Sequence, residues 1–252
     1  MNPSLMSACG EFICELCEVT PGGLAVFFPS FDYLGTIWTH WKTTGLLQRL
    51  QNIKKLFREP RQSTALSQIM QAYAAAAMSR SGACIVAVIG GKLSEGINFN
   101  DDLARAVVLV GLPYPNVASV AVSLTCIYLR EKINFLNRNF SSPPVTTLGS
   151  QEMGVNASRS EESARLTPGQ LLCETVCMRS VNQAIGRSVR HAKDYAAIFL
   201  LDRRFSRKQV HVLNGLPSWA QPALVQPPPA NLAALLNQLK EFFLRNKSDA
   251  SC

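Results

Sequence analysis

The sequence lacks several features that would place it in another class of protein. It has no run of about 18 apolar residues, so we expect no transmembrane helix. Its first ten residues contain no basic stretch followed by an apolar one, so we expect no secretory signal. Charged residues are only 17% of the 252, against 47% hydrophobic ones, which excludes a chain disordered by composition. These absences predict a folded protein with an apolar core and no membrane partner.

The sequence also lacks a phosphate-binding P-loop. That motif is a glycine, four residues, then Gly-Lys-Ser or Gly-Lys-Thr. Around Gly91-Lys92, Val86 stands where the first glycine is required, and Leu93 follows the lysine. The match fails at both ends, so we do not expect a complete P-loop enzyme.

Paired cysteines at zinc-binding spacing are absent too. Cys14 and Cys17 form one C-x-x-C, but no second pair follows them. Cys84 and Cys126 lie in apolar runs, where a free thiol behaves as a small hydrophobic group. The eight cysteines therefore predict ordinary thiols in a reducing compartment, and no metal site.

Positive charge is present in excess. The chain has 25 Lys and Arg against 17 Asp and Glu, a net charge of +8 and a pI near 9.2. Lys and Arg neutralise phosphates and release counterions, so this balance suits a polyanionic partner. It suits a basic protein without such a partner equally well, and charge alone leaves both alternatives open.

Short apolar runs alternate with helical patterns along the chain. The runs at residues 24–28, 53–57, 84–89, 106–110 and 195–201 predict strands. Helices are expected at 31–44 after the N-cap Ser30, at 63–78, 117–136, 171–191 and 230–246. This alternation predicts an α/β fold with a parallel sheet and helices on both faces. Ligands bind at the carboxyl ends of such strands, so the loops after Phe28, Ile89, Val110 and Leu201 should share one edge.

Changes in composition divide the chain into four parts. Residues 1–20 form an N-terminal segment with little pattern, and residues 21–137 with 171–212 form the α/β domain. Residues 138–170 are rich in Ser, Thr, Pro, Asn and Glu and predict a flexible polar insertion. Residues 213–252 are a C-terminal tail with a Pro-rich spacer and an amphipathic terminal helix of unknown partner.

The segment at residues 181–191 carries the sharpest chemical pattern. On a continuous helix, Gln183, Arg187 and Arg190 would lie within roughly 60° of each other. Gly186 between them lets a ligand or another backbone approach closely. Two guanidiniums and an amide on one face suit a polyphosphate, since the planar fork of Arg matches phosphate oxygens. The alternative is a solvated helix face with two surface arginines.

Three further segments place polar or aromatic groups at strand ends. After the run at 84–89, a loop with three glycines offers Ser94 and Asn98 to the phosphates of a nucleic-acid strand. Ser30 follows the run at 24–28 and begins a helix, where an anion can bind. Tyr114 follows the run at 106–110 and either stacks on a base or covers the edge of the sheet. For each segment, the alternative to ligand binding is a turn or helix cap with a purely structural role.

Taken in order, these segments resemble motifs IV, V, Va and VI of the XPD-like superfamily 2 DNA helicases of the iron–sulfur DEAH type. They resemble in particular the chromosome-loss-related DEAD/H-box branch, which acts in sister-chromatid cohesion. The matching residues are 22–30, 90–99, 107–116 and 177–205. The resemblance implies a RecA-like fold, that of the second motor domain at the C-terminal end of the helicase.

The resemblance also implies roles for single residues. Gln183, Arg187 and Arg190 would be catalytic and face ATP, with the two arginines acting as fingers on the γ-phosphate. Gly186 would lie at the nucleotide, and Glu95 with Gly96 would couple the nucleotide cleft to DNA. The residues implied at single-stranded DNA are Ser30, Ser94 and Asn98, and Tyr114 joins them from its position.

The parent activity is ATP-dependent 5′–3′ DNA unwinding in replication, repair or cohesion. It implies a nuclear location and three kinds of partner: single-stranded or forked DNA, a first motor domain, and replication or cohesion proteins. The P-loop, the Asp-Glu-Ala-His motif and the four iron–sulfur cysteines belong to that first domain, and this sequence has none of them. We therefore expect ATP and Mg²⁺ to be shared with that domain, no iron–sulfur cluster in this chain, and no turnover by the chain alone. The alternative is a non-catalytic module that binds nucleic acid or docks on a protein.

Overall fold

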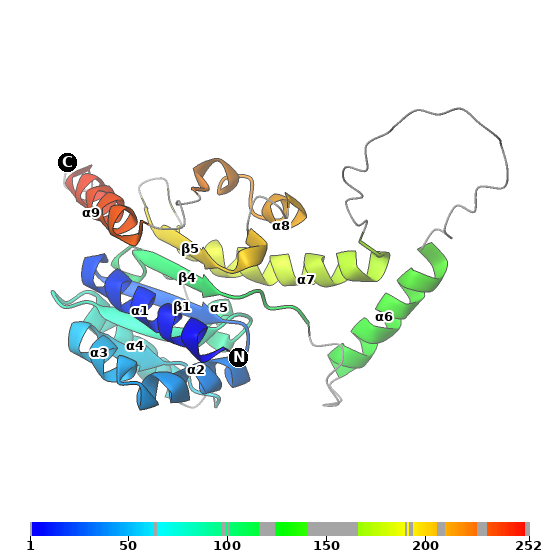
Figure 1. Cartoon of the computed structure of the whole chain (residues 1–252), viewed down its shortest axis with the longest axis horizontal. Coiled ribbons are helices and arrows are strands. Elements are labelled where there is room, and N and C mark those ends of the chain that lie inside the picture. Colours follow the sequence, from blue (N-terminus) through cyan, green and yellow to red (C-terminus); the bar gives the residue numbers. More distant parts are fainter. Residues whose placement is uncertain are drawn as a thin grey trace. The chain divides into compact units, whose positions relative to one another are not determined.

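The computed structural model describes residues 2–62, 65–96, 99, 101–115, 124–140, 166–189, 191, 194–205, 210–225 and 231–249. The chain forms two compact units (Figure 1). Unit 1 comprises Met1–Pro113 and Met178–Cys252, and unit 2 comprises Tyr114–Cys177. Unit 1 thus includes both the first twenty residues and the C-terminal tail, which the composition of the sequence set apart.

Unit 1 is built on one parallel sheet, as predicted. Its strands are β1 (Gly23–Phe28), β2 (Lys55–Arg58), β3 (Ala83–Val88), β4 (Ala106–Val110) and β5 (Ala197–Leu201). Their order across the sheet is β2-β3-β1-β4-β5, and every neighbouring pair is parallel. All five expected strands form, with ends within two residues of the predicted ones. The α/β fold class is therefore confirmed.

Burial explains why the central strands are continuous apolar runs. Every residue of β1, β3 and β4 is buried, since these strands have a neighbour on each side and helices over the sheet. The edge strands β2 and β5 contain no fully buried residue. The edge strand β2 includes Lys55 and Arg58, whereas the edge strand β5 is as apolar as the central strands, with α9 packed nearby.

Helices cover one face of the sheet and form its main core. They are α1 (Pro3–Val19), α2 (Phe31–Thr43), α3 (Leu46–Ile53) and α9 (Leu232–Asp249). Alternate residues of β1 point into this core, among them Leu24, Val26 and Phe28. The predicted N-cap of α2 is confirmed, because the hydroxyl of Ser30 accepts a hydrogen bond from the N–H of Tyr33 at 3.1 Å.

The opposite face of the sheet packs on α4 (Leu66–Ala77) and on aromatic side chains. The ring of Phe99 lies between those of Phe27 and Tyr73, at centroid distances of 5.8 and 6.1 Å. Tyr73 is fully buried, and its hydroxyl donates a hydrogen bond to the carbonyl oxygen of Leu103. Helices on both faces were predicted and are present. The expected cap of α4, Ser63, lies outside the described residues.

The N-terminal helix α1 was not anticipated from the sequence. Its residues Ile13, Cys14 and Leu16 are fully buried in the main core. The indole N–H of Trp41 on α2 donates to the carbonyl oxygen of Met6 on α1 at 2.8 Å. Apolar and small residues are mixed along α1, so its sequence shows no clear amphipathic periodicity. Its buried face is identified only by its packing against the rest of the core.

The terminal helix α9 has a partner after all. Leu239 and Phe243 are buried in the main core, and the ring of Phe242 lies edge-on to Tyr195 just before β5. In Figure 1, α9 lies beside α1 over the β5 side of the sheet. Because β5 is an edge strand, α9 shields a flank that would otherwise be open.

Two long helices account for the described part of unit 2. α6 (Leu124–Phe140) and the first turns of α7 (Pro168–Ile185) meet where the N–H of Gly169 donates to the side-chain oxygen of Asn137 at 2.9 Å. The predicted helix at 117–136 is therefore present but displaced, and residues 116–123 lie outside the described part. The predicted insertion, 138–170, overlaps both helices at its ends, and residues 141–165 of it are not described.

The remaining elements are short and lie in unit 1. They are α5 (Lys92–Gly96), α8 (Val210–Asn214) and the 3₁₀ turns Asp101–Leu103, Arg203–Phe205 and Gln221–Ala223. Among the described residues, no helix combines the length and the apolar character needed to cross a membrane.

Candidate functional site

The carboxyl ends of the strands meet at one edge of the sheet, as predicted. The N–H of Ile89 after β3 donates to the carbonyl of Phe28 on β1 at 2.8 Å, and that of Gly111 after β4 donates to Leu201 of β5 at 3.1 Å. A Cβ on Gly111, whose φ is 76°, would lie 3.1 Å from the ring of Pro29. The loops after β1, β3, β4 and β5 are thus neighbours.

A buried carboxylate, Glu59, holds the loop that follows β3. One oxygen of Glu59 accepts from the N–H of Val88 at 2.8 Å and the other from that of Leu93 at 3.0 Å. Any Cβ on Gly91 would come within 2.7 Å of this carboxylate, so only glycine fits there. Sequence reasoning missed Glu59. Its one signal was its place directly after β2, at the ligand-bearing edge.

The same loop contains four predicted site residues. Ser94 is buried, and its hydroxyl donates to the carbonyl of Gly91 at 2.9 Å, so it braces the loop from inside. Glu95 and Gly96 end the short helix α5, and the side chain of Glu95 is not described. Asn98 lies outside the described residues. A direct contact of Ser94 with DNA remains a prediction, and in this structure the hydroxyl points into the loop.

A backbone hydrogen bond joins this loop to the arginine-bearing segment. The N–H of Phe99 donates to the carbonyl of Arg187 at 3.2 Å. Phe99 is itself anchored in the core of unit 1, with 1% of its surface exposed. The segments that resemble motifs V and VI, nearly ninety residues apart in the sequence, therefore lie side by side.

The helical geometry predicted for the arginines is wrong. α7 ends at Ile185, so Gln183 is on the helix while Gly186 and Arg187 lie in the turn after it. The carbonyl of Ile185 accepts from both the N–H and the hydroxyl of Ser188, at 3.1 and 2.7 Å. Glycine is a poor helix former and this serine takes the bonds that the next turn would need, which explains the stop.

The predicted residues of this segment differ in exposure. Gln183 and Gly186 are exposed, and Arg187 is half-buried. The predicted partner Arg190 lies outside the described residues. The structure thus brings Gln183, Gly186 and Arg187 together at one end of α7, and their roles toward ATP remain predictions.

Two other predicted residues are separated between the units. Ser30 is exposed at the start of α2 in unit 1, where its hydroxyl caps the helix. Tyr114 belongs to unit 2, is half-buried, and its hydroxyl donates to Glu174 at 3.4 Å. A contact of either residue with nucleic acid stays a prediction.

Asp202 closes the edge after β5. Burial acts to raise the pKa of its carboxyl, but hydrogen bonds and charge from Arg204 and the N–H of Leu112 outweigh it, so the pKa is lowered. The two oxygens accept from the Arg204 guanidinium at 2.8 and 2.7 Å. Asp202 is therefore a charged tie between the ends of β4 and β5.

A second charged cluster lies at the start of β4, toward the opposite edge. Arg105 is 7% exposed and donates to Asp102 and to the buried Asp194, at 3.0 Å each, while its guanidinium stacks 4.1 Å from the ring of Tyr195. Asp194 could also group with Asp101 and His191 as metal ligands. Both carboxylates of this group already have a cation partner, because Arg105 lies 4.0 Å from Asp101 and 3.0 Å from Asp194, so we assign no metal to it.

An iron–sulfur cluster needs thiolate ligands, and three of the described cysteines, Cys9, Cys14 and Cys84, are poor candidates for that role. Burial raises the pKa of Cys9 to about 12 and of Cys14 to about 11. A side-chain hydrogen bond with Cys17, together with burial, raises the pKa of Cys84 well above its ordinary value. These thiols stay protonated and act as small core groups.

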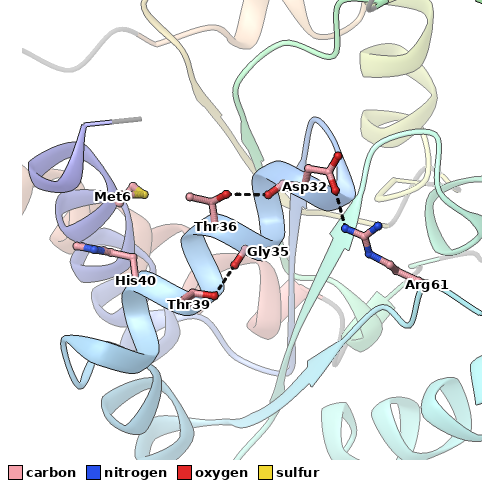
Figure 2. Close-up of a pocket in the computed structure, with 7 residues that line it drawn as sticks. All are labelled: Met6, Asp32, Gly35, Thr36, Thr39, His40 and Arg61. Atoms are coloured by element: carbon pink, nitrogen blue, oxygen red, sulfur yellow. Dashed lines mark hydrogen bonds and ion pairs between the residues drawn. The ribbon is translucent and has the colours of Figure 1, made fainter. Parts of the chain in front are cut away.

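A shallow hollow of about 720 Å³ lies on the outer side of α2 (Figure 2). Figure 2 shows Met6 and His40 at one end and the Asp32–Arg61 ion pair, 2.6 Å long, at the other. The hydroxyls of Thr36 and Thr39 on its wall donate to carbonyls of their own helix. It contains none of the predicted site residues.

Comparison with known proteins decides the family. The model of the family described as "Helicase C-terminal domain" matches residues 13–223. This chain belongs to the helicase C-terminal domain family. The match includes all five strands and the segments that meet at the carboxyl edge. The predicted resemblance is confirmed at this level.

Relatives of this helicase C-terminal domain are DNA helicases of eukaryotes. It is 40% identical to mouse "ATP-dependent DNA helicase DDX11" over 86% of this chain and 22% of that protein. It is 36% identical to "ATP-dependent DNA helicase CHL1" of the yeast Scheffersomyces stipitis, over 96% of this chain and 26% of that protein. The chain thus spans about a quarter of the length of these relatives.

A solved structure supports the fold. The structure titled "Structure of S. tokodaii Xpd4" matches with a TM-score of 0.50 over 86% of this chain and 33% of that one. The sequences are only 18% identical, so this likeness shows the fold alone. It agrees with the predicted RecA-like parallel sheet.

Proposed function

We propose that this chain is the second motor domain of an ATP-dependent 5′–3′ DNA helicase. The observation that carries the proposal is the hydrogen bond from Phe99 to Arg187, which joins the glycine loop after β3 to the arginine-bearing turn after α7. In a motor, a DNA-contacting loop tied to a nucleotide-contacting arginine can pass a change at one ligand to the other. The family match supports this reading.

The arginines of this segment supply positive charge where phosphoryl transfer develops negative charge. Arg187, with Arg190, acts as a finger on the γ-phosphate, and Gln183 and Gly186 line the same nucleotide. ATP with Mg²⁺, held by a first motor domain, supplies the bond whose hydrolysis drives movement. Glu95 and Gly96 couple that site to the strand bound near Ser30, Ser94, Asn98 and Tyr114.

The biological setting follows from the relatives as part of the proposal. Mouse DDX11 and yeast CHL1 are titled ATP-dependent DNA helicases, so we infer a nuclear role in replication, repair or sister-chromatid cohesion. Single-stranded or forked DNA, a first motor domain and replication or cohesion proteins are the partners proposed.

The role of Arg187 as an arginine finger can be tested by ATP hydrolysis. We expect negligible DNA-stimulated ATP hydrolysis by the chain alone and measurable hydrolysis once a relative's separately purified first motor domain is added. Arg187→Ala should lower that rate on the order of a thousandfold, since a finger is worth roughly 10³ to 10⁵ in turnover. Arg187→Lys keeps the positive charge but loses the planar guanidinium that can donate two hydrogen bonds to phosphate. The hydrolysis rate of the mixture should therefore remain severely reduced.

Arg179→Ala is the matched control, since Arg179 is exposed on the same helix α7. It should leave the rate of the mixture unchanged. Full activity of Arg187→Ala in the mixture would refute the finger role. Turnover by the isolated chain would reveal a nucleotide site that the missing P-loop argues against.

A second candidate is a non-catalytic module that binds nucleic acid or docks on a protein. The net charge of +8 favours it, together with the loops gathered at the carboxyl edge of the sheet, which such a module would use for binding. Such a module would bind DNA with steep salt dependence and without any effect of nucleotide, even beside the first motor domain. A folded chain that gives no ATPase activity in the mixture would support this candidate.

A further inference from the structure

A row of exposed aromatic and basic side chains runs along α6 in unit 2. Tyr128, Lys132 and Phe135 are spaced i, i+4 and i+7, so on an α-helix they lie within roughly 60° of each other. Tyr128 is 61% exposed and Phe135 58% exposed. The ammonium of Lys132 lies 5.7 Å from the centre of the Tyr128 ring. We call these three residues the α6 stripe.

Another exposed aromatic ring lies at the C-terminal end of α6, roughly 120° around the helix from Tyr128 and so beside the α6 stripe rather than on it. Phe140 is 63% exposed, and its ring meets that of Phe135 edge-on at a centroid distance of 6.3 Å. Large aromatic side chains normally bury much of their surface, so exposed rings gathered on one helix indicate a surface that meets a ligand.

In the described part of unit 2, α6 packs on α7 with a different side from the α6 stripe. Ile133 and Asn137 make that contact, since a Cβ on Gly169 of α7 would lie 2.7 Å from Ile133 and 2.9 Å from Asn137. On the helix these two residues point roughly 140° to 180° away from Tyr128. The aromatic rings are therefore presented outward from the helix pair.

The charge on α6 decides between kinds of ligand. The helix carries three basic residues, Arg130, Lys132 and Arg138, against one acidic residue, Glu131. Protein interfaces are depleted in Lys at their centre, whereas surfaces for single-stranded nucleic acid combine cations with rings on which bases stack. A cation between two exposed rings, on a chain of net charge +8, matches the second kind.

We propose that the α6 stripe binds single-stranded nucleic acid, with Tyr128 and Phe135 stacking on bases and Lys132 contacting the phosphate backbone. Stacking reads no particular base, so the contact is not sequence-specific. The inference rests on the proposed function only in that both require the chain to bind nucleic acid. It adds a binding surface to unit 2 that the motif-like loops do not include.

The test is fluorescence anisotropy with the full chain, a labelled oligothymidine and the matching oligouridine. Tyr128→Ala with Phe135→Ala should weaken binding by roughly tenfold or more per ring. Tyr128→Phe with Phe135→Tyr keeps both rings and should retain wild-type affinity. Lys132→Ala should lower the slope of log affinity against log salt by about one, whereas the ring variants leave that slope unchanged.

Trp219→Ala is the control for a general effect of removing an exposed ring, because Trp219 is 52% exposed in unit 1. It should bind as the wild type does. Circular dichroism of each variant checks that the chain remains folded. A loss confined to oligothymidine or to oligouridine would assign the site to DNA or to RNA.

Wild-type affinity in the folded double alanine variant would overturn the inference. A second result would also overturn it. If sedimentation shows that the wild type self-associates, and the double alanine variant loses self-association but binds the oligonucleotides as before, then a second copy of the chain covers the stripe. If the wild-type chain binds no oligonucleotide, the DNA contacts of the proposed function fail as well. If binding is normal and only the Arg187→Ala ATPase test fails, the inference stands and the motor proposal does not.

Discussion

At the residue scale, a few buried polar groups fix the loops of the candidate site. Glu59 accepts two backbone N–H groups at the ends of the loop after β3, and Ser94 donates within it. Ser188 likewise closes the end of α7 onto Ile185. A buried polar group without a hydrogen-bond partner costs free energy, so each loop has one favoured conformation. The other residues of the loop are therefore held in fixed positions.

Glu59→Ala should therefore destabilise the chain by about 2 kcal/mol or more, because it leaves two buried N–H groups without an acceptor. Glu59→Gln keeps one acceptor and should lose roughly half as much. Urea unfolding gives the free energy, and hydrogen exchange at Val88 and Leu93 reports the loop. Glu11→Ala, exposed on α1, is the control. Unchanged exchange at both amides in Glu59→Ala would contradict the bracing role.

Asp202 gives a prediction on pH. Its pKa is lower in the folded chain than the ordinary 3.8, so the unfolded state binds the proton more tightly. The stability it contributes is fully present above pH 3.8 and is lost as the pH falls through the lower, folded pKa. The free energy of unfolding should thus fall more steeply below pH 3.8 in the wild type than in Asp202→Asn. Parallel acid unfolding curves of the two proteins would contradict this.

At the element scale, the two terminal helices are part of the domain and not appendages. α1 contributes fully buried residues to the main core, and α9 covers the side of the sheet at β5. α9 lies beyond residue 223, where the family match ends, yet it packs on elements within that match. Its contribution to stability should therefore be large for a helix at a chain end.

Phe243→Ala should lower the free energy of unfolding by about 3 kcal/mol or more, since it removes a buried ring from the main core. The adjacent Leu244→Ala is the matched control, because Leu244 is 70% exposed, and it should change stability by about 0.5 kcal/mol at most. Urea unfolding measures both. Equal effects of the two substitutions would show that α9 does not pack as described.

The elements also show where sequence patterns fail. The strands were predictable because each central strand is a continuous apolar run bounded by turn residues. The end of α7 was not, since Gly186 and Ser188 sit in a segment whose periodicity continues past them. α1 was not, because its apolar and small residues show a buried face only against the sheet. Periodicity predicts that an element exists better than it predicts where the element stops.

At the scale of the whole molecule, the parallel sheet gathers the candidate site from distant parts of the sequence. β1 lies at the centre between β3 and β4, so the loops that follow residues 28, 88, 110 and 201 come to one edge. The turn with Arg187 joins them through Phe99. Unit 2, with the α6 stripe, follows β4 in the chain, and its described residues are mainly helical.

The sequence by itself determined the fold class, the five strands, the carboxyl edge that carries the loops, and the family. These follow from local patterns, namely apolar runs, turn residues and short motifs in a fixed order. Only the tertiary structure decided that Glu59 braces the glycine loop, that Ser94 is buried, and that Arg187 lies in a turn. It also decided that both terminal helices belong to the core. The bracing by Glu59 and the burial of both terminal helices depend on contacts between residues far apart in the chain, which no local pattern encodes. Ser94 and the turn at Arg187 are fixed by short-range bonds to Gly91 and from Ser188 to Ile185, which the periodicity of the sequence does not reveal.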